Sequence, residues 1–307
     1  MELQGTSEFV VDGEGKLYHL GIDATEIAPK MILVGDPARA LRVADRFGSI
    51  HSEVRRREFV TLTGDYRGCS VSVIGTGIGT DNVEIAMLES YAALSLDLAT
   101  LKRRDSPPEI TMIRVGTSGG AQPDVAAGTL CVAEYALGLD STGPYFDHPA
   151  SDSVIQDIED RAERLLDQTI SSNSRFKGRL KPYASKACPN LYRLLLARAQ
   201  RVDSAVLGGI TVSAPGFYGA SSRRIEGLTN TVPDIKGTLA QLEVEGRRVL
   251  NFEMESSLLF LLAEALGIRA CTICPSISQP GSHDAIPPYA PRVEASIDIA
   301  LQTLVEV

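Results

Sequence analysis

The chain has 307 residues, with 30 Lys and Arg against 39 Asp and Glu, so its formal net charge is −9 at pH 7. This acidity excludes a protein that binds nucleic acid by neutralising phosphates over a broad surface, because that mode needs an excess of basic residues. Hydrophobic residues make up 44% and charged residues 22%, as in an ordinary globular protein. No apolar run reaches the ~18 residues of a membrane span, so we expect no membrane partner.

The first sixteen residues are acidic and lack an apolar stretch, so residues 1–16 are predicted to be an N-terminal extension rather than a secretory signal. Five cysteines are a low and odd number, which favours a reducing compartment and a cytoplasmic protein. Cys271 and Cys274 form a C-x-x-C inside an apolar run, with no second Cys or His pair nearby. This pattern favours buried thiols over a metal or redox site.

Strand-like and helix-like runs alternate along the chain. A strand at 31–34 is followed by a helix at 38–47. Strands at 59–63 and 70–74 come next, joined by a hairpin through Gly64–Asp65. A capping box of Asp81 and Glu84 then begins a helix that runs to about Leu98. Further strands are predicted at 112–115, 129–133, 206–212, 249–252 and 270–274, and helices at 152–168, 190–201, 235–245, 254–266 and 292–305. The alternation predicts one α/β domain, residues 17–307, with a central mixed β-sheet flanked by helices.

Residues 151–187 are predicted to form an exposed insertion in this domain. Its later part, 169–187, is rich in Ser, Lys and Arg and has the composition of a mobile segment. A cover over the functional site is the alternative interpretation, since long loops often act as lids.

Three glycine-bearing turns follow predicted strands. In the first, Gly35 ends a strand and Pro37 opens a helix, so backbone N–H groups can approach an anion at the helix N-terminus. Arg39 falls in the first turn of that helix and would face the same point; a plain connection with Arg39 in solvent is the alternative. The second turn, 75–79, imitates a dinucleotide fingerprint, but its acid, Asp97, lies near the end of a helical run instead of at a strand tip, which disfavours NAD.

The third turn begins with Arg114 at the end of a strand and continues with Gly116 and Thr117. A guanidinium fork, a close backbone approach and a hydroxyl together suit a dianionic phosphate. The next residue, Ser118, completes a G-x-S-x-G pattern, which is typical of the nucleophile elbow of α/β-hydrolases.

A serine hydrolase that uses Ser118 is therefore an alternative, with Asp234 and His283 as the other two members of a triad. The elbow must run directly into a helix, whereas Pro123, three residues after Gly120, breaks any helix that starts there. The hydrolase pattern is incomplete for this reason.

Two acids, Glu253 and Glu255, stand at the start of a very apolar predicted helix, 257–266. The helix dipole and the free N–H groups favour carboxylates at this place, which is the structural interpretation. In the functional interpretation one carboxylate accepts hydrogen bonds from the vicinal hydroxyls of a ribose. The segment alone leaves both open.

Taken together, these segments resemble the nucleoside phosphorylase-I family and, within it, the branch that acts on uridine. The matching residues follow the order of the family over most of the chain: Tyr18-His19-Leu20-Gly21, Gly35-Asp36-Pro37 with Arg39, Arg57-Glu58-Phe59, Gly75-Thr76-Gly77-Ile78-Gly79, Arg114-Val115-Gly116-Thr117-Ser118-Gly119-Gly120, Phe217-Tyr218 with Arg223, and Asn251-Phe252-Glu253-Met254-Glu255-Ser256. The resemblance implies a reversible phosphorolysis of uridine to uracil and ribose 1-phosphate, with inorganic phosphate as co-substrate and neither a cofactor nor a metal.

The resemblance also implies a role for each matched residue. Phosphate would be bound by Gly35, Arg39, Arg57, Arg114 and Thr117, ribose by His19, Met254 and Glu255, and the base by Phe217, Ser221 and Arg223. Arg114 and Arg223 are the catalytic candidates, because one positions the nucleophile and the other stabilises charge on the departing base. His19 and Arg57 would come from a partner subunit, so a homodimer with shared sites is the expected minimal unit. A larger ring and a structural cation at the interface stay open.

Two positions depart from the family pattern. Ser221 stands where a Gln usually precedes the Arg of the base loop, and Gln279 stands where a second Arg is expected. A short hydroxyl cannot make a bidentate amide contact, so the choice among uridine, thymidine and deoxyuridine stays open. The purine branch carries an Asp just after the late strand; here the next acid is the more distant Asp284, which favours a pyrimidine. A purine nucleoside phosphorylase of the same family is the alternative.

Overall fold

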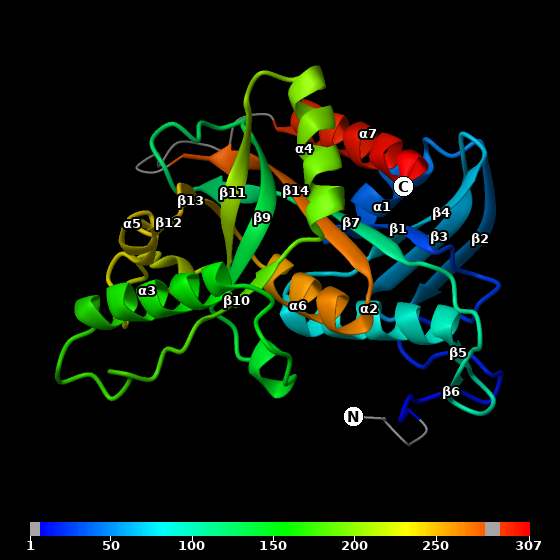
Figure 1. Cartoon of the computed structure of the whole chain (residues 1–307), viewed down its shortest axis with the longest axis horizontal. Helices are drawn as coiled ribbons and strands as arrows, with labels where there is room; N and C mark the ends of the chain where they lie inside the picture. The colour runs from blue at the N-terminus through cyan, green and yellow to red at the C-terminus, as the bar shows by residue number, and fades with distance from the viewer. Residues whose placement is uncertain (1–6, 280–288) are drawn as a thin grey trace. The chain divides into compact units, whose positions relative to one another are not determined.

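The structure, a computed structural model, describes residues 7–279 and 289–307 and divides into two compact units (Figure 1). The first unit runs to Ile113 and includes Leu301–Val307, and the second is Arg114–Ala300. Strand β7 (Thr111–Val115) and helix α7 (Ala290–Glu306) each continue from one unit into the other. Both units combine a mixed β-sheet with helices, which confirms the predicted α/β class.

The sheet of the first unit has the strand order β2-β3-β4-β1-β7. Its strands and helices are β1 (Lys30–Val34), α1 (Pro37–Ala44), β2 (Ser49–Arg56), β3 (Phe59–Tyr66), β4 (Cys69–Gly75) and α2 (Thr80–Ser95), followed by a small hairpin of β5 (Leu96–Asp97) and β6 (Lys102–Arg103). β1 pairs parallel with β4, and β2, β3 and β4 form an antiparallel meander. The carboxyl ends of β1 and β4 therefore lie side by side, each followed by a glycine turn.

The predicted hairpin through Gly64–Asp65 is wrong, because β3 continues through these residues to Tyr66. The turn falls instead at Arg67 and Gly68, both with positive φ. Gly64 serves a close approach between strands: a Cβ on it would collide with Ser49 O of β2. β2 itself was not predicted, since its polar side chains are mostly exposed and give no apolar alternation.

Helix α2 differs from its prediction at both ends. Its N-cap is Gly79, which makes no side-chain cap hydrogen bond, so the predicted capping box does not open the helix. The helix ends at Ser95, and Asp97 pairs in the small hairpin with β6, where its side chain accepts a hydrogen bond from the N–H of Ala99. Asp97 is thus outside the main sheet. A dinucleotide site needs this acid at the end of a strand of the main sheet, so the NAD interpretation does not fit.

The sheet of the second unit closes on itself. Its elements are β8 (Ser118–Gly120), β9 (Leu130–Gly138), α3 (Ser153–Thr169), β10 (Tyr183–Lys186), α4 (Pro189–Val202), β11 (Val206–Ser213), α5 (Ile235–Leu239), β12 (Glu243–Val244), β13 (Arg247–Glu253), α6 (Ser256–Leu266) and β14 (Arg269–Ser278), with 3₁₀ turns η1 (Gly143–Tyr145) and η2 (Gly219–Ser221). The strand order is β10-β9-β11-β13-β8-β14, and β9 pairs with β14 as well as with β11. The pairing from β9 through β11, β13, β8 and β14 back to β9 makes a ring.

Helices α4 and α6 both contact β9, β11 and β14 (Figure 1). α6 is buried along nearly its whole length, because its sequence is apolar on every face and polar only at its ends. α5 is shorter than the predicted helix 235–245: it ends at Leu239, and Glu245 and Gly246, both with positive φ, form the turn between β12 and β13. Among the described residues, no helix is long and apolar enough to cross a bilayer.

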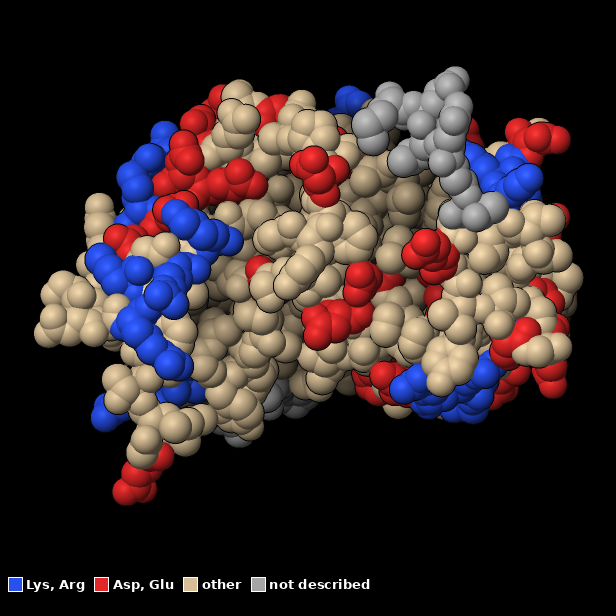
Figure 2. Space-filling view, turned by 90° about the horizontal axis from the view of Figure 1, so that it is seen from below, with Lys and Arg blue, Asp and Glu red and all other residues tan. Residues whose placement is uncertain are grey.

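The predicted insertion, 151–187, is only partly exposed. Helix α3 buries one face, including Ile158 and Leu166, in a core cluster of the second unit, and β10 pairs with β9. Only residues 171–182 lie almost wholly at the surface, with Lys177 and Lys181 paired to acids of α3. Figure 2 shows basic side chains gathered over the end of the second unit that carries α3.

Candidate functional site

Arg114, at the end of β7, is the centre of a buried charged cluster in the second unit. Its side chain is 6% exposed and its Nη1 lies 3.1 Å from Glu253 Oε2, while its Nη2 forms an ion pair with Glu255 Oε2. Burial opposes the charge of the guanidinium, but the two carboxylates outweigh that effect, so the pKa of Arg114 is raised above its usual value. The guanidinium is a fixed positive charge with a fixed orientation.

Gly116 makes room for this arrangement. A Cβ on Gly116 would collide with the Arg114 guanidinium and lie 2.8 Å from Cys274 Sγ. Arg114 Nη1 also donates to Cys274 Sγ at 3.2 Å, and burial raises the pKa of that thiol to about 11. Cys271 is buried too, so the prediction of buried thiols is confirmed, although Cys274 has a polar contact that its sequence context did not suggest.

The two acids before α6 have different surroundings: Glu253 fits the structural interpretation, and Glu255 is the carboxylate of the functional one. Glu253 accepts hydrogen bonds from the N–H groups of Glu255 (3.0 Å) and Ser256 (3.1 Å), so it stabilises the start of α6 as well as pairing with Arg114. Glu255 follows the strand, is 3% exposed and pairs with Arg114. Met254 between them is half-buried. The carboxylate predicted to hold ribose hydroxyls is thus fixed beside the guanidinium predicted to hold phosphate.

The predicted base residues share one surface loop after β11. Phe217 is 52% exposed, and the Arg223 guanidinium stacks 4.1 Å from its ring centroid while Nε donates to Phe217 O at 3.1 Å. Ser221 lies in η2 and its N–H donates to Tyr218 O. The structure therefore brings Phe217, Ser221 and Arg223 together, and it places Arg223 on the exposed side of the loop.

In the first unit, the two glycine turns meet at the ends of β1 and β4. Thr76 N–H donates to Val34 O at 2.8 Å, and a Cβ on Gly35 would lie 3.1 Å from Gly77 O. Asp36 caps α1 by accepting from Ala38 N–H, and Arg39 in the first turn is only 7% exposed. The alternative that placed Arg39 in solvent is wrong.

His19 and Arg57 also lie in the first unit, gathered around Tyr18. His19 and Tyr18 rings are 5.0 Å apart edge to face, and Arg57 lies 5.7 Å from the Tyr18 centroid. Arg57 occupies the turn between β2 and β3 with φ 54°, and its side chain is about half exposed. Buried Glu89 holds His19: its carboxylate accepts from the backbone N–H groups of His19 and Leu20 and lies 2.6 Å from His19 Nδ1.

The hydrolase alternative lacks its defining geometry. Ser118 lies in β8, and the chain passes from Gly120 through a turn into β9, so no helix follows the serine. Asp234 caps α5 by accepting from Gly237 N–H at 2.9 Å. His283 lies outside the described residues, as does Asp284. The G-x-S-x-G spacing of residues 116–120 therefore does not form a nucleophile elbow.

A family model described as the phosphorylase superfamily matches residues 29–300. The chain belongs to the phosphorylase superfamily. Curated relatives named uridine phosphorylase include those of Thermococcus kodakarensis, 28% identical over 85% of this chain and 76% of the relative, and of Escherichia coli, 26% identical over 83% and 82%. The resemblance found in the motifs is thereby confirmed.

Solved structures agree with this membership of the superfamily. A Trypanosoma brucei nucleoside phosphorylase, described as showing uridine phosphorylase activity, has a TM-score of 0.86, 26% identity, and covers 98% of this chain and 100% of its own. A purine nucleoside phosphorylase from Toxoplasma gondii has a TM-score of 0.63 at 22% identity, covering 97% of this chain and 98% of its own, and shares the fold.

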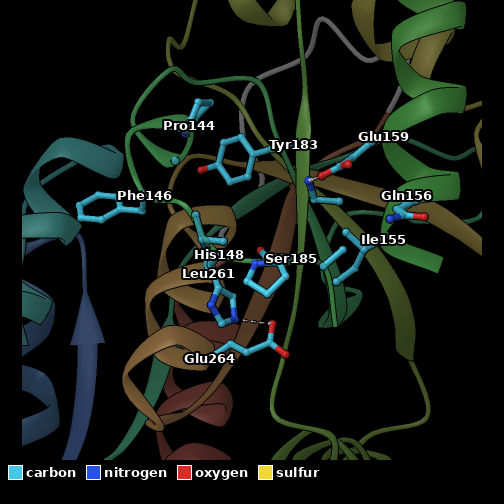
Figure 3. Close-up of a pocket in the computed structure, with 14 residues that line it drawn as sticks. Pro144, Phe146, His148, Ile155, Gln156, Glu159, Tyr183, Ser185, Leu261 and Glu264 are labelled. Atoms are coloured by element: carbon cyan, nitrogen blue, oxygen red, sulfur yellow. Dashed lines mark hydrogen bonds and ion pairs between the residues drawn. The ribbon is translucent and has the colours of Figure 1, made fainter. Parts of the chain in front are cut away.

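The second unit of this phosphorylase also contains a cavity of about 360 Å³ bordered by η1, α3, β10 and α6 (Figure 3). His148 Nε2 lies 3.9 Å from Glu264 Oε2 in its wall, and burial raises the pKa of Glu159, whose carboxylate accepts from Ala184 N–H. None of the predicted site residues lines it.

Sequence reasoning missed two groups that support the candidate site of the phosphorylase. Glu89 fixes His19 across a separation of 70 residues, and no local pattern announces that pairing. Glu253 was recognised as an acid of the motif but not as a partner of Arg114, which only the arrangement of β7 and β13 reveals. Among the described residues, no group of three or more His, Cys, Asp and Glu could hold a metal ion.

Proposed function

We propose that this phosphorylase is a uridine phosphorylase, a pentosyltransferase that converts uridine and phosphate reversibly to uracil and ribose 1-phosphate. The observation that carries the proposal is the similarity to enzymes named uridine phosphorylase over 83–85% of the chain. The buried Arg114–Glu255 pair supports it, because a cation for phosphate and an acceptor for ribose hydroxyls stand side by side. Inorganic phosphate is the co-substrate, and the reaction uses no other cofactor.

In this proposal the phosphate is bound by Gly35, Arg39, Arg57, Arg114 and Thr117, and the ribose by His19, Met254 and Glu255. A phosphate oxygen attacks C1′ from the face opposite the base, and the C1′–N1 bond breaks with its electron pair left on uracil. Arg114 contributes by positioning the nucleophile, since its charge and orientation are already fixed by Glu253 and Glu255. Glu255 accepts hydrogen bonds from the ribose hydroxyls as positive charge develops on the sugar.

The base is held by Phe217, Ser221 and Arg223. Phe217 offers a flat apolar face, and Arg223 donates to a uracil carbonyl, where negative charge accumulates as the bond breaks. A donor that acts on developing charge stabilises the transition state more than the substrate. A pyrimidine is the preferred base, because the sequence lacks the acid that the purine branch carries just after the late strand.

The test measures how turnover of uridine, deoxyuridine, thymidine and inosine depends on phosphate. Base release is monitored by the change in absorbance. We expect turnover of uridine that requires phosphate and yields ribose 1-phosphate. Faster turnover of inosine than of uridine would establish the purine alternative instead. Hydrolysis without phosphate would overturn the proposal altogether.

The proposal includes a homodimer whose sites are shared, with His19 and Arg57 supplied by the partner. Their clustering around Tyr18 on the first unit supports it, because two functional side chains then act as one surface element. Mixing inactive Arg57→Ala with inactive Arg114→Ala subunits should restore activity, since one site per mixed dimer keeps both residues. If tagged subunits exchange and no activity returns, the sites are not shared.

We also place the protein in the cytoplasm. All five cysteines are free thiols, which supports a reducing compartment. Fractionation of the producing cell with an antibody to the native protein tests this, and recovery with an extracytoplasmic fraction would overturn it.

A further inference from the structure

Lys236 is a cation that the assigned roles leave unused, and it is tied to the base loop. It lies in α5, directly after Ile235. Ser222 of the base loop accepts a hydrogen bond from Ile235 N–H at 2.7 Å and donates to Val232 O at 2.8 Å. The first bond joins α5, and the second joins the residues just before it, to the segment that carries Phe217 and Arg223.

The Lys236 ammonium lies over the paired strands β8 and β13. Its Nζ is 5.8 Å from the Phe252 ring centroid, and a Cβ on Gly119 would lie 3.2 Å from it. Gly119 and Phe252 are neighbours in the pairing of these strands. Thr117 precedes Gly119 by two residues and Met254 follows Phe252 by two. In this antiparallel register, the residues proposed to hold phosphate and ribose lie two positions along the strands from the pair that Nζ approaches.

The electrostatic surroundings of Lys236 are unfavourable for a cation. Among the described residues, none accepts a hydrogen bond from the Lys236 ammonium or forms an ion pair with it, although Lys236 is half-buried. Burial and the nearby Arg223 lower its pKa, and the opposing charge of Asp234 does not reverse this. The Asp234 carboxylate is itself engaged at the N-terminus of α5. Lys236 and Arg223 are thus two nearby cations whose charges are little compensated by acids. Such an arrangement suits an electron-rich ligand.

We propose that Lys236 is a second cationic contact to the base, donating from Nζ to a uracil carbonyl oxygen. This inference rests on the proposed function. When the C1′–N1 bond breaks, its electron pair spreads over the uracil ring and its two carbonyl oxygens, and the phosphate oxygen–C1′ bond forms. Lys236 and Arg223 then share the stabilisation of that anion, and uracil takes up a proton from water after release. An ammonium has three donors and no acceptor, so it suits carbonyl groups and opposes an exocyclic amino group.

The test compares Lys236→Met, which keeps the length of the side chain, with Lys236→Arg, which keeps the charge. The control is Lys181→Met, which removes the same charge from the exposed segment 171–182. We expect Lys236→Met to lower kcat/KM for uridine by roughly 10- to 100-fold, as for a hydrogen bond to a charged group. Lys236→Arg should recover much of the loss, and KM for phosphate should match that of the control.

A second substrate separates a base contact from a structural role. 5-Fluorouridine has a better leaving group and needs less stabilisation of its anion, so its loss in Lys236→Met should be clearly smaller than that of uridine. Equal losses for both substrates, with a lowered Tm, would show that Lys236 only supports the fold. A Lys236→Met variant that matches Lys181→Met on uridine would overturn this inference alone. A wild-type protein inactive on uridine would overturn the proposed function and this inference with it.

Discussion

The two arginines proposed to act on the substrate are held in opposite ways. Arg114 is buried at the end of β7, and two carboxylates and a thiol fix its guanidinium. Arg223 is exposed on the loop after β11, and its guanidinium rests on the Phe217 ring and on a backbone carbonyl of the same loop. Arg114 is thus held by contacts between distant elements, whereas Arg223 is held by contacts within one loop.

This contrast has a consequence for how each side can vary. A buried ion pair cannot lose one partner without leaving a charge unpaired in a medium of low dielectric constant, so changes around Arg114 alter folding and activity together. A loop held by its own backbone bonds can exchange side chains at small cost in stability. The substitution of Ser221 for the usual Gln falls on the side where exchange is cheap.

The largest expected effect follows from removing the buried arginine. Arg114→Ala should cost about 2–5 kcal/mol in transition-state stabilisation for phosphorolysis, because phosphate loses a desolvated charge-assisted contact. It should also lower Tm, since Glu253 and Glu255 stay buried without their cation. Steady-state kinetics with varied phosphate and thermal unfolding measure both effects. Unchanged kcat/KM for phosphate would remove Arg114 from the phosphate site.

Arg223→Ala is expected to separate activity from stability. Uridine kcat/KM should fall by about 10²-fold or more, because a donor to the developing anion is lost. The free energy of unfolding should change by less than about 0.5 kcal/mol, as for an exposed side chain. A large fall in Tm would show that Arg223 supports the fold as Arg114 does, and the two arginines would then not differ in this respect.

A smaller effect is expected at Gly116, whose missing side chain leaves space for Arg114. Gly116→Ala should destabilise the fold by about 1–3 kcal/mol, because the new methyl group displaces the guanidinium or the Cys274 thiol. KM for phosphate should rise more than KM for uridine. Equal rises would indicate that the turn serves both substrates alike. The variant Gly116→Ala/Cys274→Ala provides the control, since it relieves only the contact with sulfur.

The smallest effect is expected at Ser221. Ser221→Ala should change uridine kcat/KM by less than about tenfold, because a bond from a neutral hydroxyl contributes little. Ser221→Gln, which restores the usual residue, tests whether the loop has room for an amide. A loss in Ser221→Ala as large as in Arg223→Ala would show a direct contact between this hydroxyl and the base.

Elements with a strong local signal could be predicted from the sequence. Strands β1, β7 and β11 are apolar runs, and α3 and α4 have clear amphipathic periods, so each was located to within a few residues. Strands β2 and β10 could not be predicted, because polar side chains and edge positions conceal their pairing. The end of α5 was missed because the short strand β12, Glu243–Val244, was included in the predicted helix.

The candidate site shows the same division. Arg39 and Arg114 stand beside glycines at strand ends, and this local pattern announces an anion site. The pairings that fix the side chains, His19 with Glu89 and Arg114 with Glu253, join residues far apart in the sequence. Nothing local distinguishes these acids from solvated ones, so only the folded chain reveals them.

The backbone of Arg57 bears on how this protein would respond to engineering. Its φ of 54° lies in the left-handed region, which costs a non-glycine residue about 1–2 kcal/mol. Glycine would relieve that cost in the turn between β2 and β3 and would also delete the guanidinium. A library selected only for thermal resistance should therefore enrich Arg57→Gly, and the most heat-resistant clones would be among the first to lose turnover.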